Sequence, residues 1–166
     1  MQNPKLNDKD KVLSYLDLKR FALSQGYTED SIILISDLSR INSLNELFGK
    51  RFFSFVFSYI ENQTIGHFTL LSHIDDNTIE YYDSFGQLPD TIKEFADKIN
   101  CSVIFSSVKL QNAKSFLCGK HVILRLLSVG TPLDEYVKFM RSNKNYSPDK
   151  IVDLLIQIKD YDTSYK

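Results

Sequence analysis

The chain has 166 residues, of which 43% are hydrophobic and 25% are charged. This length fits one domain with a buried core, and the composition excludes a low-complexity or disordered protein. Lys and Arg number 20 against 21 Asp and Glu, so the formal net charge is −1 and no overall field draws the chain to nucleic acid or to a membrane surface.

The two cysteines, Cys101 and Cys118, form no disulfide framework, and no C-x-x-C pair indicates a zinc site. Residues 1–10 are polar, and no stretch approaches the roughly 20 apolar residues that span a bilayer. We therefore expect a protein that is not secreted, works in a reducing compartment and needs neither cofactor nor metal.

The first part of the chain favours helices. Residues 8–25 have the spacing of an amphipathic helix, with apolar positions at Val12, Leu13, Leu16 and Leu23. Ser43 to Glu46 has the spacing of a capping box, and Gly49 follows as a stop signal. Between them, residues 31–38 form an apolar run that the pattern assigns to neither helix nor strand.

The composition of the sequence changes at Phe52. The runs 52–60, 67–74 and 78–85 are rich in aromatic and β-branched residues and are separated by polar turn clusters. This pattern predicts three strands in a meander.

The rest of the chain predicts four helices and one more strand. Residues after Pro89 have helical spacing, residues 102–108 return to strand, and residues 119–129 are apolar on most sides, which indicates a central buried helix. Thr131 with Pro132, and Ser147 with Pro148, look like N-caps followed by proline at the first helical position. In the last helix the expected apolar stripe is Ile151, Leu154, Leu155 and Ile158. We expect a single domain over residues 1–166, of α+β class, with the helix 119–129 at its centre.

Cys118 stands where a polar loop meets the apolar run 119–129. The first turn of a helix carries partial positive charge and unpaired N–H groups, which favour a thiolate and can hold an oxyanion. Cys118 is therefore a candidate nucleophile, and Gly119 leaves room beside its sulfur for a substrate. The alternative is an inert core cysteine, because cysteine is often buried.

A thiol nucleophile needs a base, and three histidines are available. His67 begins a predicted strand, where a side chain can face a cleft. His73 lies about 20 Å further along the same strand, at ~3.3 Å per residue, so the two cannot serve one site. His121 lies on the same helix as Cys118 and leaves little room for a substrate between them.

The hairpin that follows His67 tests whether this histidine has an orienting acid. If residues 75–77 form a three-residue loop, Thr69 pairs with Asp83, and His67 becomes a diagonal neighbour of Asp83 on one face. A two-residue turn would place the two side chains on opposite faces. Pairing therefore requires an odd-numbered loop, and Glu80, the other acid on this strand, has the opposite parity.

Gln111, seven residues before Cys118, could donate a side-chain N–H to the same oxyanion. His67, Asp83, Gln111 and Cys118 with Gly119 thus form an ordered set. With the sequences GHFTLL, YYDSFG and QNAKSFLCG around them, they resemble the adenovirus-type maturation proteases and the related proteases of ubiquitin-like proteins. The resemblance covers residues 52–130, although Phe68 replaces a common tryptophan and an aspartate replaces the usual adenoviral glutamate.

The resemblance implies a papain-like fold in permuted chain order, with a mixed sheet packed against the helix that carries Cys118. It also implies Cys118 as nucleophile, His67 as general base and acid, Asp83 as orienting acid, and Gln111 with the Cys118 N–H as oxyanion hole. The implied activity is that of a cysteine endopeptidase that cleaves viral capsid or other structural precursors, usually beside glycine, during particle maturation.

Such proteases occur in virophages and Polinton-like elements, and the implied location is the virion and the host-cell cytoplasm or viral factory. Some relatives need a peptide or DNA activator, for which Cys101 is a conceivable contact; a buried cysteine at a strand start is the simpler interpretation. Two other functions stay open, namely deconjugation of ubiquitin-like proteins and a non-catalytic α+β interaction domain. An acyltransferase with the same Cys-His-acid apparatus is a further possibility.

Overall fold

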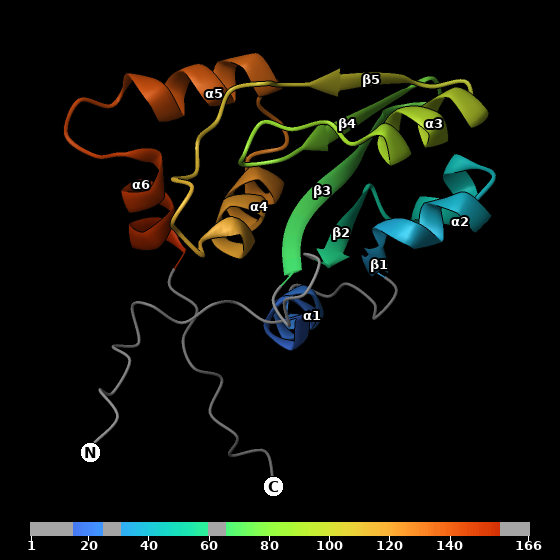
Figure 1. The fold of residues 1–166 in the computed structure, drawn as a ribbon, viewed down its shortest axis with the longest axis horizontal. Coiled ribbons are helices and arrows are strands. Elements are labelled where there is room, and N and C mark those ends of the chain that lie inside the picture. The colour runs from blue at the N-terminus through green and yellow to red at the C-terminus, as the bar shows by residue number, and fades with distance from the viewer. Residues whose placement is uncertain (1–14, 25–30, 60–65, 157–166) are drawn as a thin grey trace, which may run out of the picture.

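A computed structural model describes residues 15–24, 31–59 and 66–156. Its centre is a five-stranded mixed sheet in the order β1-β2-β3-β4-β5 (Figure 1). The strands are β1 (Ile32–Leu34), β2 (Phe53–Tyr59), β3 (Gly66–Asp75), β4 (Thr78–Tyr82) and β5 (Ser102–Phe105). β2, β3 and β4 are antiparallel, whereas β1 is parallel to β2 and β5 is parallel to β4. The predicted three-strand meander is confirmed.

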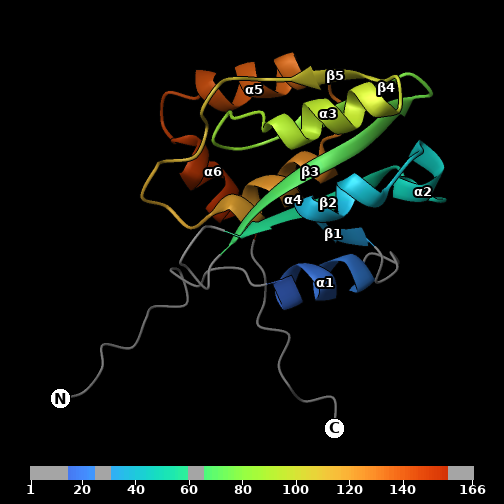
Figure 2. The ribbon, with the colours of Figure 1, turned by 45° about the vertical axis from the view of Figure 1, so that its right-hand side comes forward.

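Helices cover both faces of this sheet (Figures 1 and 2). One face carries α1 (Tyr15–Ser24), α4 (Cys118–Leu127), α5 (Leu133–Ser142) and α6 (Pro148–Leu155). The other carries the 3-10 helix η3 (Ile35–Arg40) with α2 (Leu44–Phe48) and α3 (Asp90–Lys98). The predicted α+β class, with the Cys118 helix packed against a mixed sheet, is confirmed.

Alternation along the strands divides the core into two layers. On β2, Phe53, Phe55 and Phe57 pack toward α4 and α5, whereas Val56 packs toward α2 and α3. On β3, Leu70 packs on the α4 side and the next residue, Leu71, packs on the α3 side. Because both faces are covered, side chains on both sides of β2 and of the middle of β3 are buried, whether they are apolar or polar.

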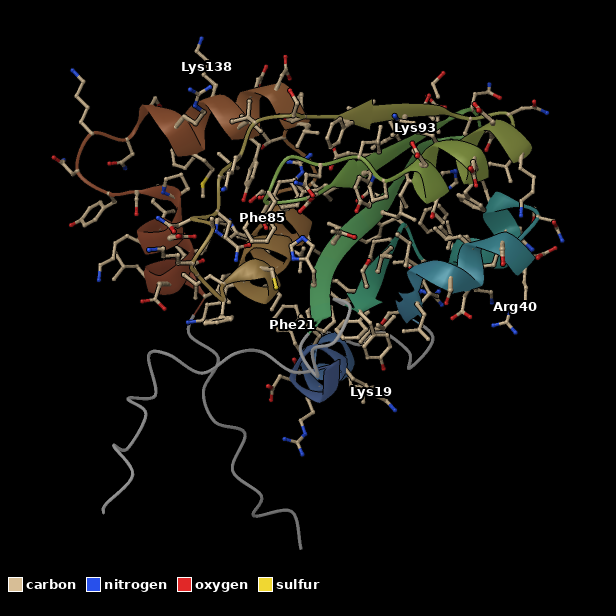
Figure 3. All side chains as sticks on the ribbon, in the orientation of Figure 1. Lys19, Phe21, Arg40, Phe85, Lys93 and Lys138 are labelled. Atoms are coloured by element: carbon tan, nitrogen blue, oxygen red, sulfur yellow. The ribbon has the colours of Figure 1, made fainter. Side chains whose placement is uncertain are left out.

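The apolar run 31–38 serves both kinds of structure, because it forms β1 and then turns into η3. α1 is the described part of the first predicted helix and directs Phe21 toward the sheet (Figure 3). Leu18 is its fully buried residue, whereas Leu23 is 46% exposed, so Leu23 was wrongly placed on the packed face. Residues 8–14 of that prediction lie outside the described residues.

Two predicted helix starts are confirmed by their caps. The Ser43 hydroxyl accepts a hydrogen bond from the Glu46 N–H at 3.1 Å, and the Ser147 hydroxyl accepts one from the Lys150 N–H at 3.2 Å. The Glu46 carboxylate accepts from the Asn42 N–H, so the capping box is not closed on Ser43 itself. Satisfied N–H groups fix where α2 and α6 begin.

The predicted cap at Thr131 is wrong. α5 begins at Leu133 with Pro132 as its N-cap, because the Pro132 carbonyl accepts the first helical hydrogen bond, from the Tyr136 N–H. The stripe predicted for α6 is also wrong in part, since Leu154 and Leu155 are 45% and 62% exposed. α6 ends at Leu155 and packs through Ile151, Val152 and the following Ile156, whereas Ile158 lies outside the described residues.

A buried ion pair fixes α4 to the sheet. Arg125 makes two hydrogen bonds to the Glu80 carboxylate, at 2.9 and 2.7 Å, and its guanidinium lies 5.0 Å from the centre of the Tyr136 ring. Arg125 and Glu80 are 1% and 2% exposed. The predicted opposite parity of Glu80 and Asp83 agrees with this contact, because the Glu80 carboxylate is held by Arg125 and not by His67.

None of the helices in the described part of the chain combines the length and the apolar character that a membrane span requires.

Candidate active site

His67 and Asp83 meet at the end of the β3–β4 hairpin. The ladder pairs Leu70 with Tyr82 and His73 with Ile79, which is the register that a three-residue loop would produce. The turn itself has only two residues, because Asp75 pairs with Thr78. The requirement for an odd-numbered loop is therefore wrong.

A β-bulge between His73 and Asp75 supplies the missing residue. One extra residue on β3 shifts every later pair by one, so a two-residue turn and a bulge together give the parity of a three-residue loop. His67 Nε2 consequently donates a hydrogen bond to Asp83 Oδ1, 2.6 Å away. A bulge leaves no clear mark in the sequence, which is why the turn length alone misled the prediction.

The Asp83 carboxylate is fixed by its own turn. Oδ1 also accepts the Phe85 N–H at 2.9 Å, and Oδ2 accepts the Gln87 N–H at 3.1 Å. Gly86 makes this turn possible, because its φ is +69° and a Cβ there would lie 2.5 Å from the Ser107 carbonyl oxygen. Asp83 is 5% exposed, so it presents a preorganised acceptor to His67.

Aromatic packing sets the plane of the His67 ring. The Phe85 ring lies 4.8 Å from it, centroid to centroid, with 31° between the planes, and Lys109 Nζ lies 5.7 Å from the centre of the Phe85 ring. Figure 3 shows Phe85 above α4, next to the chain that leaves β4. The His67 side chain keeps 17% of its surface exposed, so the ring is shielded but still accessible.

His67 carries a strongly shifted pKa. Burial alone would lower it, but the hydrogen bond to Asp83, the hydrogen bond with Cys118 and the charges of these two groups raise the pKa of His67 to about 9. Nε2 is held by Asp83, which leaves Nδ1 for the sulfur of Cys118. The ring therefore joins the acid on β4 to the thiol on α4.

Cys118 is the first residue of α4 and is 8% exposed. The first hydrogen bond of the helix runs from the His121 N–H to the Leu117 carbonyl, and no side chain caps this end. The N–H groups of Cys118, Gly119 and Lys120 thus precede the helical ladder and direct their partial positive charge toward the sulfur. This is the environment predicted for a nucleophile or oxyanion at this position.

Gln111 is buried, and both ends of its side-chain amide are held. Oε1 accepts a hydrogen bond from the Ser84 hydroxyl at 2.6 Å, and Nε2 donates one to the Ser115 carbonyl at 2.9 Å. The Ser84 carbonyl also accepts the Leu110 and Gln111 N–H groups, at 2.8 and 2.9 Å. The second Nε2 hydrogen has no partner among these contacts, so the amide is oriented with one N–H to spare.

Ser84 is therefore a residue that sequence reasoning missed. It follows Asp83 directly and is fully buried, so one dipeptide holds both the orienting acid and the amide of Gln111. The only feature of the sequence that could have indicated this role was the position of Ser84 next to Asp83, since serine is common at the ends of strands.

The other candidate residues lie apart from this site. His73 stacks on Phe48 of α2, with ring centroids 5.3 Å apart. His121 is fully buried, and its Nε2 lies 2.8 Å from Asp149 Oδ1, so Asp149 is a second partner that the sequence did not reveal. Cys101 is buried before β5, where burial and the nearby Asp75 carboxylate raise its thiol pKa.

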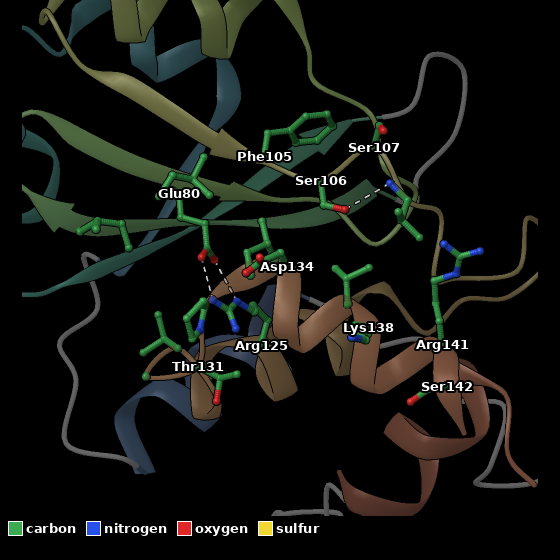
Figure 4. Close-up of a pocket in the computed structure, with 18 residues that line it drawn as sticks. Glu80, Phe105, Ser106, Ser107, Arg125, Thr131, Asp134, Lys138, Arg141 and Ser142 are labelled. Carbon is green, nitrogen blue, oxygen red and sulfur yellow. Dashed lines mark hydrogen bonds and ion pairs between the residues drawn. The ribbon is translucent and has the colours of Figure 1, made fainter. Parts of the chain in front are cut away.

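A groove of about 970 Å³ lies between β5, the segment 106–108 and α5 (Figure 4). Its lining residues include the ion-paired Arg125 and Glu80, and Lys138 and Arg141 of α5. None of the four predicted site residues lines it. Within the described ranges, no group of three or more His, Cys, Asp or Glu side chains is arranged to hold a metal ion.

No protein-family model matches the chain, and no curated protein matches it. Among solved structures, the Se-Met ASFV pS273R protease is similar, with a TM-score of 0.47 and 14% sequence identity. The match covers 92% of this chain and 71% of that one. At this identity and TM-score the likeness assigns neither a family nor a function to the chain.

Proposed function

We propose that the chain is a cysteine endopeptidase in which Cys118 is the nucleophile, His67 the general base and acid, and Asp83 the orienting acid. One observation supports this proposal above all. The His67 ring is hydrogen-bonded to Asp83 and lies close enough to Cys118 for both groups to raise the pKa of His67, although Asp83 and Cys118 come from a strand end and a helix start 35 positions apart in the chain. A base between a thiol and an acid is the arrangement that thiol hydrolases require.

In the resting site the Cys118 proton has already passed to Nδ1 of His67, so a thiolate lies beside an imidazolium. The sulfur then attacks the carbonyl carbon of a peptide bond, and the carbonyl oxygen becomes an oxyanion. The Cys118 N–H and the spare Nε2–H of Gln111 stabilise that oxyanion. His67 next donates its proton to the leaving amine as the C–N bond breaks, which leaves a thioester on Cys118.

Deacylation reverses these roles. His67 takes a proton from water, the hydroxide attacks the thioester carbon, and the C–S bond breaks to release the acid product and restore the Cys118 thiolate beside the His67 imidazolium. The His67 pKa of about 9 keeps the ring protonated at neutral pH, so the resting site already holds the proton that the leaving amine needs. Asp83 stabilises this imidazolium and holds its orientation without taking the proton.

Our proposal for the substrate rests on the family resemblance around GHFTLL, YYDSFG and QNAKSFLCG. The substrates are viral capsid or other structural precursor proteins, cut beside glycine during particle maturation, in the virion and in the host cytoplasm or viral factory. The same resemblance supports a papain-like fold in permuted order. The resemblance also supports a peptide or DNA activator as a partner of the chain.

Co-expression with a candidate structural precursor tests this proposal. The wild-type chain is expected to process the precursor and Cys118→Ala to leave it intact, whereas Cys101→Ala is the matched control that retains processing. Equal processing by wild type and Cys118→Ala would refute the protease proposal. A ubiquitin-like conjugate in place of the precursor distinguishes deconjugation, and a chain that cleaves neither is a non-catalytic domain.

A further inference from the structure

A second histidine–aspartate pair lies one helical turn beyond the nucleophile. His121 of α4 has no exposed surface, and its Nε2 lies 2.8 Å from Oδ1 of Asp149, in the first turn of α6. The proposed mechanism does not use this pair. Its other contacts show what it holds in place.

Asp149 connects α6 to the turn that follows Gln111. Its Oδ2 accepts the Asn112 N–H at 3.0 Å, and the Ser115 side chain lies close enough to help lower its pKa. Burial would raise the pKa of Asp149, but the hydrogen bonds from His121 and Asn112 lower it, so the carboxylate is charged at neutral pH. Charged acceptors make the stronger hydrogen bonds.

The turn itself is short and closed. The Ser115 N–H donates to the Asn112 carbonyl at 3.0 Å, and the Lys114 N–H donates to the Asn112 side chain at 2.9 Å. The Ser115 carbonyl is the acceptor that holds Nε2 of Gln111. A continuous series of hydrogen bonds therefore runs from His121 through Asp149 and this turn to the proposed oxyanion donor.

We infer that His121 and Asp149 are positioning residues for Gln111: they fix the turn at residues 112–115 on α4 and α6, and so aim the spare N–H of Gln111 at the oxyanion. This inference rests on the proposed function. α4 then fixes the positions of both groups: it carries Cys118 itself, and it holds Gln111 through His121. A displacement of about 1 Å at such a donor is enough to lose much of its effect.

The two helices also provide a matched control. Lys120, next to His121, makes an ion pair with Asp153 of α6 at 2.8 Å. Asp153 lies one turn after Asp149 and joins the same two helices, but its ion pair does not reach the Gln111 turn. Asp153→Asn therefore loosens α4 from α6 without disturbing the inferred connection.

The first test compares two reactions of Cys118 in the full chain. Peptide hydrolysis forms an oxyanion, whereas alkylation by iodoacetamide displaces iodide at a saturated carbon and forms none. We expect His121→Leu and Asp149→Ala to lower kcat about tenfold to a hundredfold, with KM and the alkylation rate constant nearly unchanged. His121→Gln, which keeps a donor for Asp149, should restore most of kcat, and Asp153→Asn should match the wild type.

A second measurement does not depend on hydrolysis. The side-chain amide signals of Gln111, assigned by their loss in Gln111→Leu, should shift and exchange faster with solvent in His121→Leu and Asp149→Ala, but not in Asp153→Asn. Unchanged Gln111 signals would overturn the inference even if the protease proposal holds. If the wild type cleaves no substrate, the protease proposal fails while the amide signals still decide whether the pair positions Gln111.

Discussion

Ser84 donates a hydrogen bond to Oε1 of Gln111 across 2.6 Å, although 27 positions separate the two residues. Ser84 also follows Asp83, which holds His67. One short segment at the end of β4 therefore orients both the base and the proposed oxyanion donor.

The Ser84→Ala variant tests this double role. The buried Oε1 of Gln111 would lose its donor, so we expect the unfolding free energy to fall by about 1 kcal/mol and kcat to fall about tenfold. Peptide kinetics and urea denaturation measure the two effects. Ser106→Ala is the control, because the Ser106 hydroxyl accepts only the Val108 N–H among the contacts described and does not touch Gln111.

The raised pKa of His67 predicts how stability depends on pH. A folded pKa of about 9 lies above the unfolded value of 6.5, so the contribution is complete below pH 6.5 and is lost as the pH rises through 9. We expect His67→Gln to be less stable than the wild type by about 3 kcal/mol at pH 6 and by much less at pH 10. Denaturation of both chains at the two pH values gives this difference, and a constant difference would contradict the raised pKa.

Thiol reactivity should distinguish the two cysteines. The His67 imidazolium and the start of α4 favour negative charge on the Cys118 sulfur, whereas burial and Asp75 raise the pKa of Cys101. At pH 6.5 we expect iodoacetamide to modify Cys118 at least about tenfold faster than Cys101, as followed by mass spectrometry of digested protein. The ratio should collapse in His67→Gln. Equal rates in the wild type would leave an activated thiolate without support.

Gly66 precedes His67 at the start of β3, and a Cβ on it would lie 1.9 Å from the Phe57 ring. That ring cannot move freely, because its centroid lies 4.8 Å from those of both Phe68 and Tyr59. We expect Gly66→Ala to lower the unfolding free energy by about 1–3 kcal/mol and to reduce activity through His67. Gly130→Ala is the control, since a Cβ on Gly130 would have no atom within 4 Å. Equal losses in both variants would contradict the packing argument.

Breaking the ion pair between Glu80 and Arg125 should lower the unfolding free energy more than Gly66→Ala does. Removing one partner leaves the other charge buried, so Glu80→Ala should lower the unfolding free energy by about 3–5 kcal/mol. The exposed pair of Lys93 and Asp90, 3.7 Å apart, is the comparison, and Lys93→Ala should cost less than about 0.5 kcal/mol. Chemical denaturation of the two variants measures both. A small loss for Glu80→Ala would mean that water reaches Arg125.

Local patterns predicted most of the secondary structure. The strands of the meander and the caps at Ser43 and Ser147 depend on residues a few positions apart, and the sequence contains these directly. The stripe through Leu154 and Leu155 failed because helical spacing extends a face beyond the point where the neighbouring elements still cover it. Pattern alone does not say where a helix stops packing.

The candidate site was predictable in its residue types but not in its supports. His67, Asp83 and Cys118 stood out because few residues can act as base, acid and nucleophile. Ser84 and Asp149 did not, since each is an ordinary polar residue whose role depends on a contact 27 or 28 positions away. Arg125 offered one usable signal, because a charge inside an apolar helix requires a buried partner.

The bulge at residue 74 has a consequence for how this hairpin can vary. The pairs on the site's side of the bulge follow from the pairing of His73 with Ile79, so a deletion that removes Ile74, or a shift of the extra residue into the turn, leaves His67 and Asp83 on one face. Ile74 is 44% exposed and contributes little to the core, so the chain carries a residue that it can lose at small cost. The far end of the hairpin can therefore change length while the proposed catalytic end keeps its alignment.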